Sequence, residues 1–121
     1  MPTILIAENE TTVMAILIAI LCRAGYQLVT ATSVREAKQK SDDFAGHIDL
    51  LITDHMLSDG IGRDAAEYII HRRPLIKILQ ISGHSPTELR AEGHLLPGAH
   101  FFAKPFRADE FRDMVSQVLV S

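Results

Sequence analysis

The sequence predicts one α/β domain over residues 1–121, a flavodoxin-like, doubly wound parallel sheet of five strands in the order 2-1-3-4-5 with five helices. Five short β-type runs alternate with helical stretches, a pattern typical of a parallel sheet with helices on both faces. Hydrophobic residues make up 47% of the chain, enough for one core. Right-handed crossovers leave few topologies, and this strand order suits the length best.

The first strand and helix are predicted from an apolar run and the residues that follow it. Residues Thr3–Ala7 form the apolar run of a buried strand. Thr11 or Thr12 can cap the next helix, which runs to about Ala24 because Gly25 suits a helix stop.

The next units repeat this pattern. Gln27–Ala31 is the second strand, and Ser33 can cap a helix through about Lys40. Ile48–Thr53 is the third strand, and a helix over about Arg63–Arg73 follows it, ahead of a proline.

The last two units complete the alternation. Ile76–Ser82 is the fourth strand, and Ser85–Glu88 is a capping box with proline at the first helical position. Ala99–Ala103 is the short fifth strand. The last helix carries an apolar stripe at helical spacing, made of Phe111, Met114, Val115, Val118 and Leu119.

The first helix is apolar on two faces. One face is an ordinary core stripe of Val13, Ile16, Leu17, Ile20, Leu21 and Ala24. The other consists of Met14, Ala15, Ile18, Ala19 and Cys22. Since a surface helix normally has a polar side, this second face is either covered or a docking patch, and we favour docking.

Composition excludes several classes of protein. The formal charge of −3, from 12 basic and 15 acidic residues, is not the basic excess of a nucleic-acid-binding protein. The single cysteine, Cys22, excludes an internal disulfide and fits a reducing cytosol. There is no signal-peptide pattern, and the longest apolar run, Val13–Cys22, is about half of a membrane span. We expect a soluble cytoplasmic protein with no nucleic-acid or membrane partner.

The residues that follow the strands suggest the chemistry, because the crevice of an open parallel sheet lies beyond the carboxyl ends of its strands. These residues are Glu8, Asn9, Glu10, Asp54, His55, Met56, Ser82 and Lys104. Carboxylates gathered at one edge repel each other unless a cation lies among them, and oxygen ligands suit Mg²⁺. A lysine and a hydroxyl opposite the metal would seat a phosphoryl group, and a carboxylate could be its acceptor.

Four blocks of the sequence resemble the receiver domains of two-component response regulators. The blocks are ILIAENE, DLLITDHMLSDGIG, ILQISGHS and GAHFFAKPF, and together they span essentially the whole chain. The resemblance implies a phosphorylation-controlled signalling module, not an enzyme, that is phosphorylated by a histidine kinase or histidine phosphotransfer protein. It also implies a downstream protein target and a phosphorylation-dependent homodimer. Because the chain ends at the fifth helix, a stand-alone receiver is expected.

The resemblance also assigns roles to residues. Asp54 corresponds to the phosphoacceptor, and Lys104 and Ser82 correspond to the residues that assist the transfer. The predicted Mg²⁺ ligands are Glu8, Asn9, Asp54 and the backbone carbonyl of Met56. Ser82 and Phe101 match the switch pair, although plain packing explains Phe101 equally well. Lys104–Pro105 matches a cis-type proline bond.

Several residues depart from the family pattern. The usual pair of aspartates is Glu8 and Asn9 here, which predicts a weakened Mg²⁺ site and supports an alternative, a pseudo-receiver that binds partners without phosphorylation. Ser58 stands where proline is usual, and His55 where an apolar residue is common. Glu10 is expected to face solvent at the helix start. The six histidines show no metal-ligand spacing and most are expected at the surface, although His84 could tune the phosphoryl lifetime.

Overall fold

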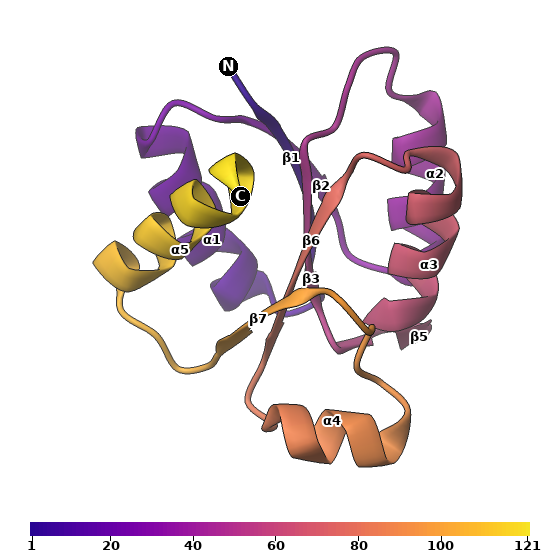
Figure 1. The fold of residues 1–121 in the computed structure, drawn as a ribbon. Helices are drawn as coiled ribbons and strands as arrows, with labels where there is room; N and C mark the ends of the chain where they lie inside the picture. Colours follow the sequence, from indigo (N-terminus) through magenta and orange to yellow (C-terminus); the bar gives the residue numbers. More distant parts are fainter.

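The computed structural model describes residues 1–121 and has three layers, with a twisted parallel sheet between helices (Figure 1). The strands of the sheet lie in the order β2-β1-β3-β6-β7, which is the predicted order 2-1-3-4-5. Their bounds are β1 Thr3–Ala7, β2 Gln27–Ala31, β3 Leu50–Asp54, β6 Lys77–Ser82 and β7 His100–Ala103. The predicted fold class is confirmed, and each strand differs from its predicted bounds by two residues at most.

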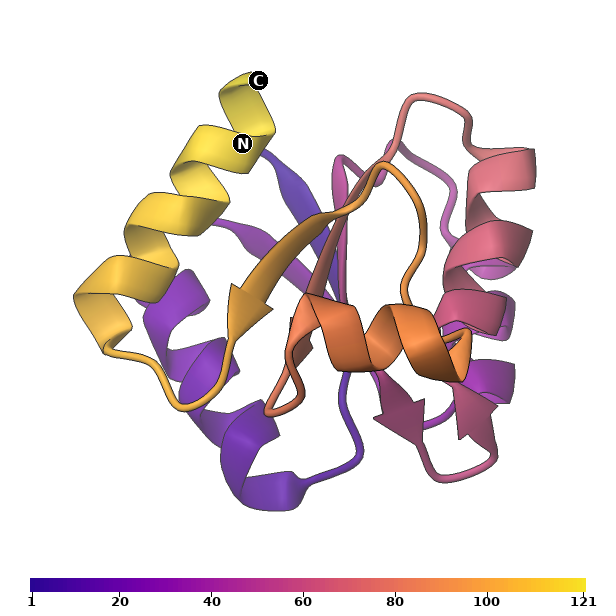
Figure 2. The ribbon, with the colours of Figure 1, turned by 60° about the horizontal axis from the view of Figure 1, so that its bottom comes forward.

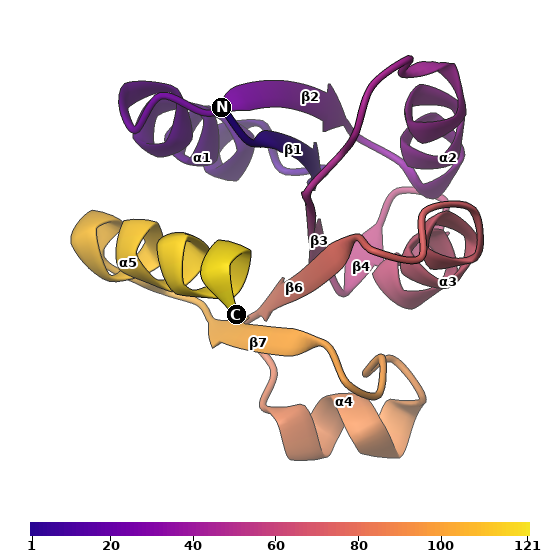
Figure 3. The same ribbon diagram turned by 45° about the horizontal axis from the view of Figure 1, so that its top comes forward.

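Five helices surround the sheet, as predicted. They are α1 Thr11–Arg23, α2 Val34–Asp43, α3 Gly62–Arg72, α4 Pro86–Glu92 and α5 Ala108–Val120. Helices α1 and α5 cover one face and α2 and α3 the other, while the short α4 lies beyond the edge strand β7 (Figure 3). None of them combines the length and the apolar character that crossing a bilayer requires.

The core has two halves, one on each face of the sheet. Successive side chains of a strand point to opposite faces. In β1, Leu5 and Ala7 therefore join the cluster under α2 and α3, whereas Ile4 and Ile6 join the cluster under α1 and α5. All four side chains are fully buried. Burial on both faces explains why the strands are continuous apolar runs.

The helix starts follow the predicted caps except at α1. Ser33 accepts a hydrogen bond from the Glu36 backbone, and Ser85 forms the predicted capping box with Glu88. The prediction that Thr11 or Thr12 caps α1 is wrong, because the N-cap residue is Glu10 and its side chain makes no capping bond. The Glu8 carboxylate accepts the Glu10 N–H at 3.0 Å. The helix begins at Thr11, one or two residues earlier than the predicted caps imply.

The predicted faces of α1 are also partly wrong. Met14, which we assigned to the outer face, is buried with Leu17 and Leu21, whereas Ile16, assigned to the core, is 49% exposed. Ile18 is half-buried against the core, and Cys22 is exposed. Because both faces are apolar, helical spacing alone did not determine how α1 is rotated on the sheet.

A small hairpin between β3 and α3 was not predicted. Strands β4 Met56–Leu57 and β5 Gly60–Ile61 pair antiparallel. The hairpin leads into α3 at Gly62, whose N–H donates to the His55 carbonyl at 2.8 Å. A Cβ at Gly62 would lie 2.0 Å from the Asp54 carbonyl oxygen, so only glycine fits at this turn.

Candidate functional site

The register of the sheet brings the predicted site residues together. Ala7 pairs with Thr53, so Glu8 and Asp54 leave neighbouring strands side by side. Asp54 pairs with Ile81, which places His55 beside Ser82. Lys104 follows β7, and its backbone N–H donates to the backbone carbonyl of Ser82 at 2.8 Å. The carboxyl ends of β1, β3, β6 and β7 thus form one edge of the sheet. Figure 2 shows the molecule turned so that α4 and β7 lie at the front.

Lys104 lies between two buried carboxylates. Its Nζ is 2.8 Å from Asp54 Oδ2 and 3.1 Å from Glu8 Oε1. Glu8 has no exposed surface, Asp54 is 5% exposed, and the Lys104 side chain is 18% exposed. The peptide bond between Lys104 and Pro105 is cis, as expected. The ammonium therefore faces the acids at the sheet edge and not bulk water.

The pKa values of these groups reflect burial and the ion pairs. Burial is the main cause that raises the pKa of Glu8 above 4.5, opposed by the hydrogen bond from the Glu10 backbone and by Lys104. Burial lowers the pKa of Lys104, but hydrogen bonds and charges from Asp54 and Glu8 outweigh it and hold the pKa above 10.5. Lys104 is therefore a permanent cation at neutral pH.

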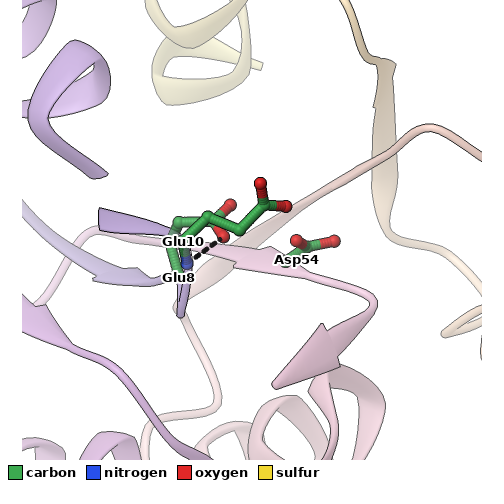
Figure 4. A group of neighbouring side chains, drawn as sticks. All are labelled: Glu8, Glu10 and Asp54. Atoms are coloured by element: carbon green, nitrogen blue, oxygen red, sulfur yellow. Dashed lines mark hydrogen bonds between the residues drawn. The ribbon is translucent and has the colours of Figure 1, made fainter. Parts of the chain in front are cut away.

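Three carboxylates converge at this edge (Figure 4). Oxygen atoms of Glu8, Glu10 and Asp54 all lie within 4.8 Å of one another. Lys104 supplies one positive charge against three negative ones, so the group keeps an excess of negative charge. Clustered carboxylate oxygens are the ligands that Mg²⁺ prefers, and the residues present therefore fit that ion.

The acid beside Asn9 has an unexpected position. The Glu10 side chain is 63% exposed, as expected for a solvent-facing residue, yet its Oε1 lies 3.9 Å from Lys104 Nζ. Asn9 is exposed at the end of β1, and its side chain makes no hydrogen bond within the protein. Glu10 thus brings a third carboxylate to the edge where Asn9 lacks one.

The Ser82 hydroxyl contacts the ring of His55 and the backbone of His84. Ser82 Oγ lies 2.8 Å from His55 Nδ1 and accepts the backbone N–H of His84 at 2.9 Å. Ser82 is fully buried and His55 is 9% exposed. Burial is the main cause that lowers the pKa of His55 below 6.5, although the Asp54 charge opposes it.

His55 is the residue of this edge for which the sequence predicted no role. We expected most histidines at the surface, but His55 is buried beside Asp54, whose Oδ1 accepts the His55 backbone N–H at 2.7 Å. The sequence carried two signals, the position of His55 directly after the third strand and a polar residue where the family usually has an apolar one. The rings of His84 and His94 pack against it, with centroids at 4.5 Å and 5.9 Å.

The other predicted residues lie around this edge. Met56 begins β4, and its residue surface is 45% exposed. The His84 side chain is half exposed and its Nδ1 lies 3.2 Å from Glu92 Oε1 of α4. Phe101 is half-buried in β7 and lines a hollow of about 470 Å³ together with Arg63 and Arg90. Phe101 is therefore not part of the closed core.

The chain matches the model of a known protein family. The model of the response regulator receiver domain matches residues 4–116, which is nearly the full length of the chain.

Individual proteins and structures agree with this match. The transcriptional regulatory protein YrkP of Bacillus subtilis is 30% identical over 112 residues, which cover 93% of this chain and 47% of YrkP. The chain thus spans about half the length of this curated relative. Among solved structures, a response regulator receiver protein from Sinorhizobium medicae has a TM-score of 0.85 at 26% identity, covering 99% of this chain and 95% of its own. The non-phosphorylated HemR receiver domain of Leptospira biflexa has a TM-score of 0.82 at 27% identity, covering 100% and 96%.

Proposed function

The chain belongs to the response regulator receiver domain family, and on that premise we propose that Asp54 accepts a phosphoryl group from a phosphohistidine. The donor would be a histidine kinase or a histidine phosphotransfer protein. The observation that supports this most is the placement of Asp54 at the sheet edge, with Oδ2 2.8 Å from Lys104 Nζ and Glu8 alongside.

The side chains at the edge have separate tasks in this transfer. A carboxylate oxygen of Asp54 forms the new bond to phosphorus as the bond from phosphorus to the donor nitrogen breaks, and the imidazole leaves with that electron pair. Lys104 neutralises charge on the phosphoryl oxygens, since positioning and charge neutralisation dominate phosphoryl transfer. The Ser82 hydroxyl donates a hydrogen bond to one of these oxygens.

Mg²⁺ fits the same edge. Its ligands would come from Glu8, Asp54, the Met56 carbonyl and the Asn9 amide oxygen, with Glu10 as an added carboxylate. When bound, the ion supplies further positive charge to the phosphoryl oxygens. The neutral amide at Asn9 supports a site weaker than one built on two aspartates.

Small-molecule phosphorylation tests the proposal. Acetyl phosphate with Mg²⁺ should label the wild type on Asp54 alone, as mapped by mass spectrometry, and Asp54→Asn should take no label. A label on another residue that persists in Asp54→Asn would overturn the assignment.

The second candidate is a pseudo-receiver that binds its partners without phosphate, and the neutral, exposed Asn9 favours it. In that case the wild type and Asp54→Asn would bind a downstream protein with equal affinity, whether or not acetyl phosphate is present. Under the leading proposal, phosphorylation shifts the population of a binding surface that includes Phe101, and only the wild type responds. The same shift would drive homodimer formation.

A further inference from the structure

We propose that His55 is a positioning residue that keeps the proton of the Ser82 hydroxyl free for a phosphoryl oxygen. The inference rests on the proposed function, because it concerns the phosphoryl group on Asp54. It is carried by the contacts that His55 and His84 make with the Ser82 hydroxyl.

A serine hydroxyl offers one donor and two acceptor lone pairs. Ser82 Oγ accepts the His84 backbone N–H at 2.9 Å, which occupies one lone pair. His55 Nδ1 lies 2.8 Å from the same oxygen. If His55 Nδ1 carries a proton, it occupies the second lone pair, and the hydroxyl can act only as a donor to something else.

The surroundings of His55 Nδ1 favour the protonated nitrogen. Besides Ser82 Oγ, the nitrogen lies 3.3 Å from Asp54 Oδ1, an oxygen of a buried carboxylate. A lone pair on Nδ1 would face that negative oxygen in a site with little solvent, whereas an N–H is attracted to both oxygens. This holds for the neutral ring and for the charged ring.

The same nitrogen faces both oxygens, so Asp54, His55 and Ser82 do not form a nucleophilic triad. A triad uses one ring nitrogen for the acid and the other for the hydroxyl. His55 therefore has no route to take the Ser82 proton while bonded to Asp54. Its role is to fix the orientation of the hydroxyl, at the site where the register places Ser82 one strand away from Asp54.

Two measurements test the role. Nitrogen-detected NMR on the wild type should show His55 with a proton on Nδ1 and Ser82 accepting from it. His55→Leu should slow labelling by acetyl phosphate about three- to tenfold, the loss expected from one hydrogen bond. His55→Asn, which restores an N–H close to the Nδ1 position, should recover most of the rate.

The double variant makes the test specific to Ser82. In a Ser82→Ala background, His55→Leu should cause no further loss, because the hydroxyl is already absent. His47→Leu, an exposed histidine in the α2–β3 loop, is the matched control and should label at the wild-type rate.

The outcomes separate this inference from the proposed function. A wild type that takes no label on Asp54 overturns the proposed function, and with it the inference. If the wild type is labelled on Asp54, three results would overturn the inference and leave the proposed function standing. They are an unchanged labelling rate in His55→Leu, a further loss of rate from His55→Leu in the Ser82→Ala background, and a His55 Nδ1 without a proton. Thermal unfolding of each variant separates a loss of positioning from a loss of fold.

Discussion

Single residues at the carboxyl ends of the strands determine the electrostatics of this site. One ammonium, that of Lys104, faces Glu8 at 3.1 Å, Asp54 at 2.8 Å and Glu10 at 3.9 Å. Since one cation does not neutralise three acids, each carboxylate would affect how well this edge holds a metal ion. Asn9, which is neutral, and Glu10, which is charged, have opposite effects on that balance.

The first prediction compares these two neighbours. Asn9→Asp should tighten Mg²⁺ binding about tenfold, and Glu10→Gln should weaken it about tenfold, because one partly screened charge beside the ion contributes on the order of 1.4 kcal/mol. Calorimetric titration with Mg²⁺ measures both. Asp43→Asn, at the distant end of α2, is the control and should bind like the wild type. Unchanged affinity in Glu10→Gln would show that this carboxylate takes no part.

The second prediction concerns Gly62. Gly62→Ala should destabilise the fold by about 2–4 kcal/mol, because the added Cβ meets the Asp54 carbonyl at 2.0 Å and Thr53 Oγ1 at 2.6 Å. Urea unfolding provides the free energies. Gly83→Ala is the matched control, since a Cβ there meets nothing within 4 Å, and its free energy of unfolding should match the wild type. Equal stability of both variants would contradict the close approach at Gly62.

At the scale of elements, the β4–β5 hairpin, which follows the strand that ends in Asp54, makes contact with a helix far away in the sequence. Asp59, between β4 and β5, accepts the backbone N–H of Val34 at 2.6 Å and of Arg35 at 3.0 Å. These groups belong to the first turn of α2, where N–H groups lack partners within the helix. Together with Ser33, the hairpin therefore caps a helix that lies far from it in sequence.

The third prediction follows from this cap. Asp59→Ala should cost about 1 kcal/mol of unfolding free energy near neutral pH, as measured by urea unfolding. Hydrogen bonds from the Arg35 and Val34 N–H groups hold the pKa of Asp59 below its usual 3.8. Its contribution is therefore present above pH 3.8 and is lost as the pH falls through the lower, folded-state pKa. The difference between wild type and variant should shrink in that acid range. A difference that grows there would contradict the cap.

At the scale of the whole molecule, the helix that directly follows Glu8, Asn9 and Glu10 has an exposed outer face. The outer face of α1 includes Ala15, Ile16, Ala19 and Cys22, all exposed. Beside it, a hollow of about 360 Å³ lies between α1 and α5, lined by Ala19, Arg23, Ala108 and Arg112 among others. We expect docking on this exposed face, which differs from the predicted one because Met14 is buried, Ile18 is half-buried and Ile16 is exposed.

The fourth prediction tests that face. Ala19→Glu should leave the unfolding free energy within about 0.5 kcal/mol of the wild type, because the position is exposed. Labelling by acetyl phosphate should be unchanged, whereas transfer from a phosphorylated histidine phosphotransfer protein that labels the wild type should slow severalfold. Ala45→Glu, exposed in the α2–β3 loop, is the control. If both transfers slow together, the substitution acts on the site and not on docking. Ile18 does not suit this test, because it packs against the core.

Sequence by itself determined the architecture and most of the site. Continuous apolar runs such as Thr3–Ala7 specify strands buried on both faces, and Ser33 and Ser85 start helices through local hydrogen bonds. The candidate site residues Glu8, Asp54, Ser82 and Lys104 were found at the ends of predicted strands, because parallel strands place their carboxyl ends at one edge of the sheet.

Tertiary structure alone decided which atoms meet. The rotation of α1, the cap from Asp59 and the position of Glu10 beside Lys104 depend on packing between elements far apart in sequence. His55 became a partner of Ser82 because the register pairs Asp54 with Ile81, and a shift of one residue would turn it to the other face. Local patterns specify what each segment forms, but the distances of 2.8 to 3.9 Å between side chains at the ends of different strands are determined only when the sheet is assembled.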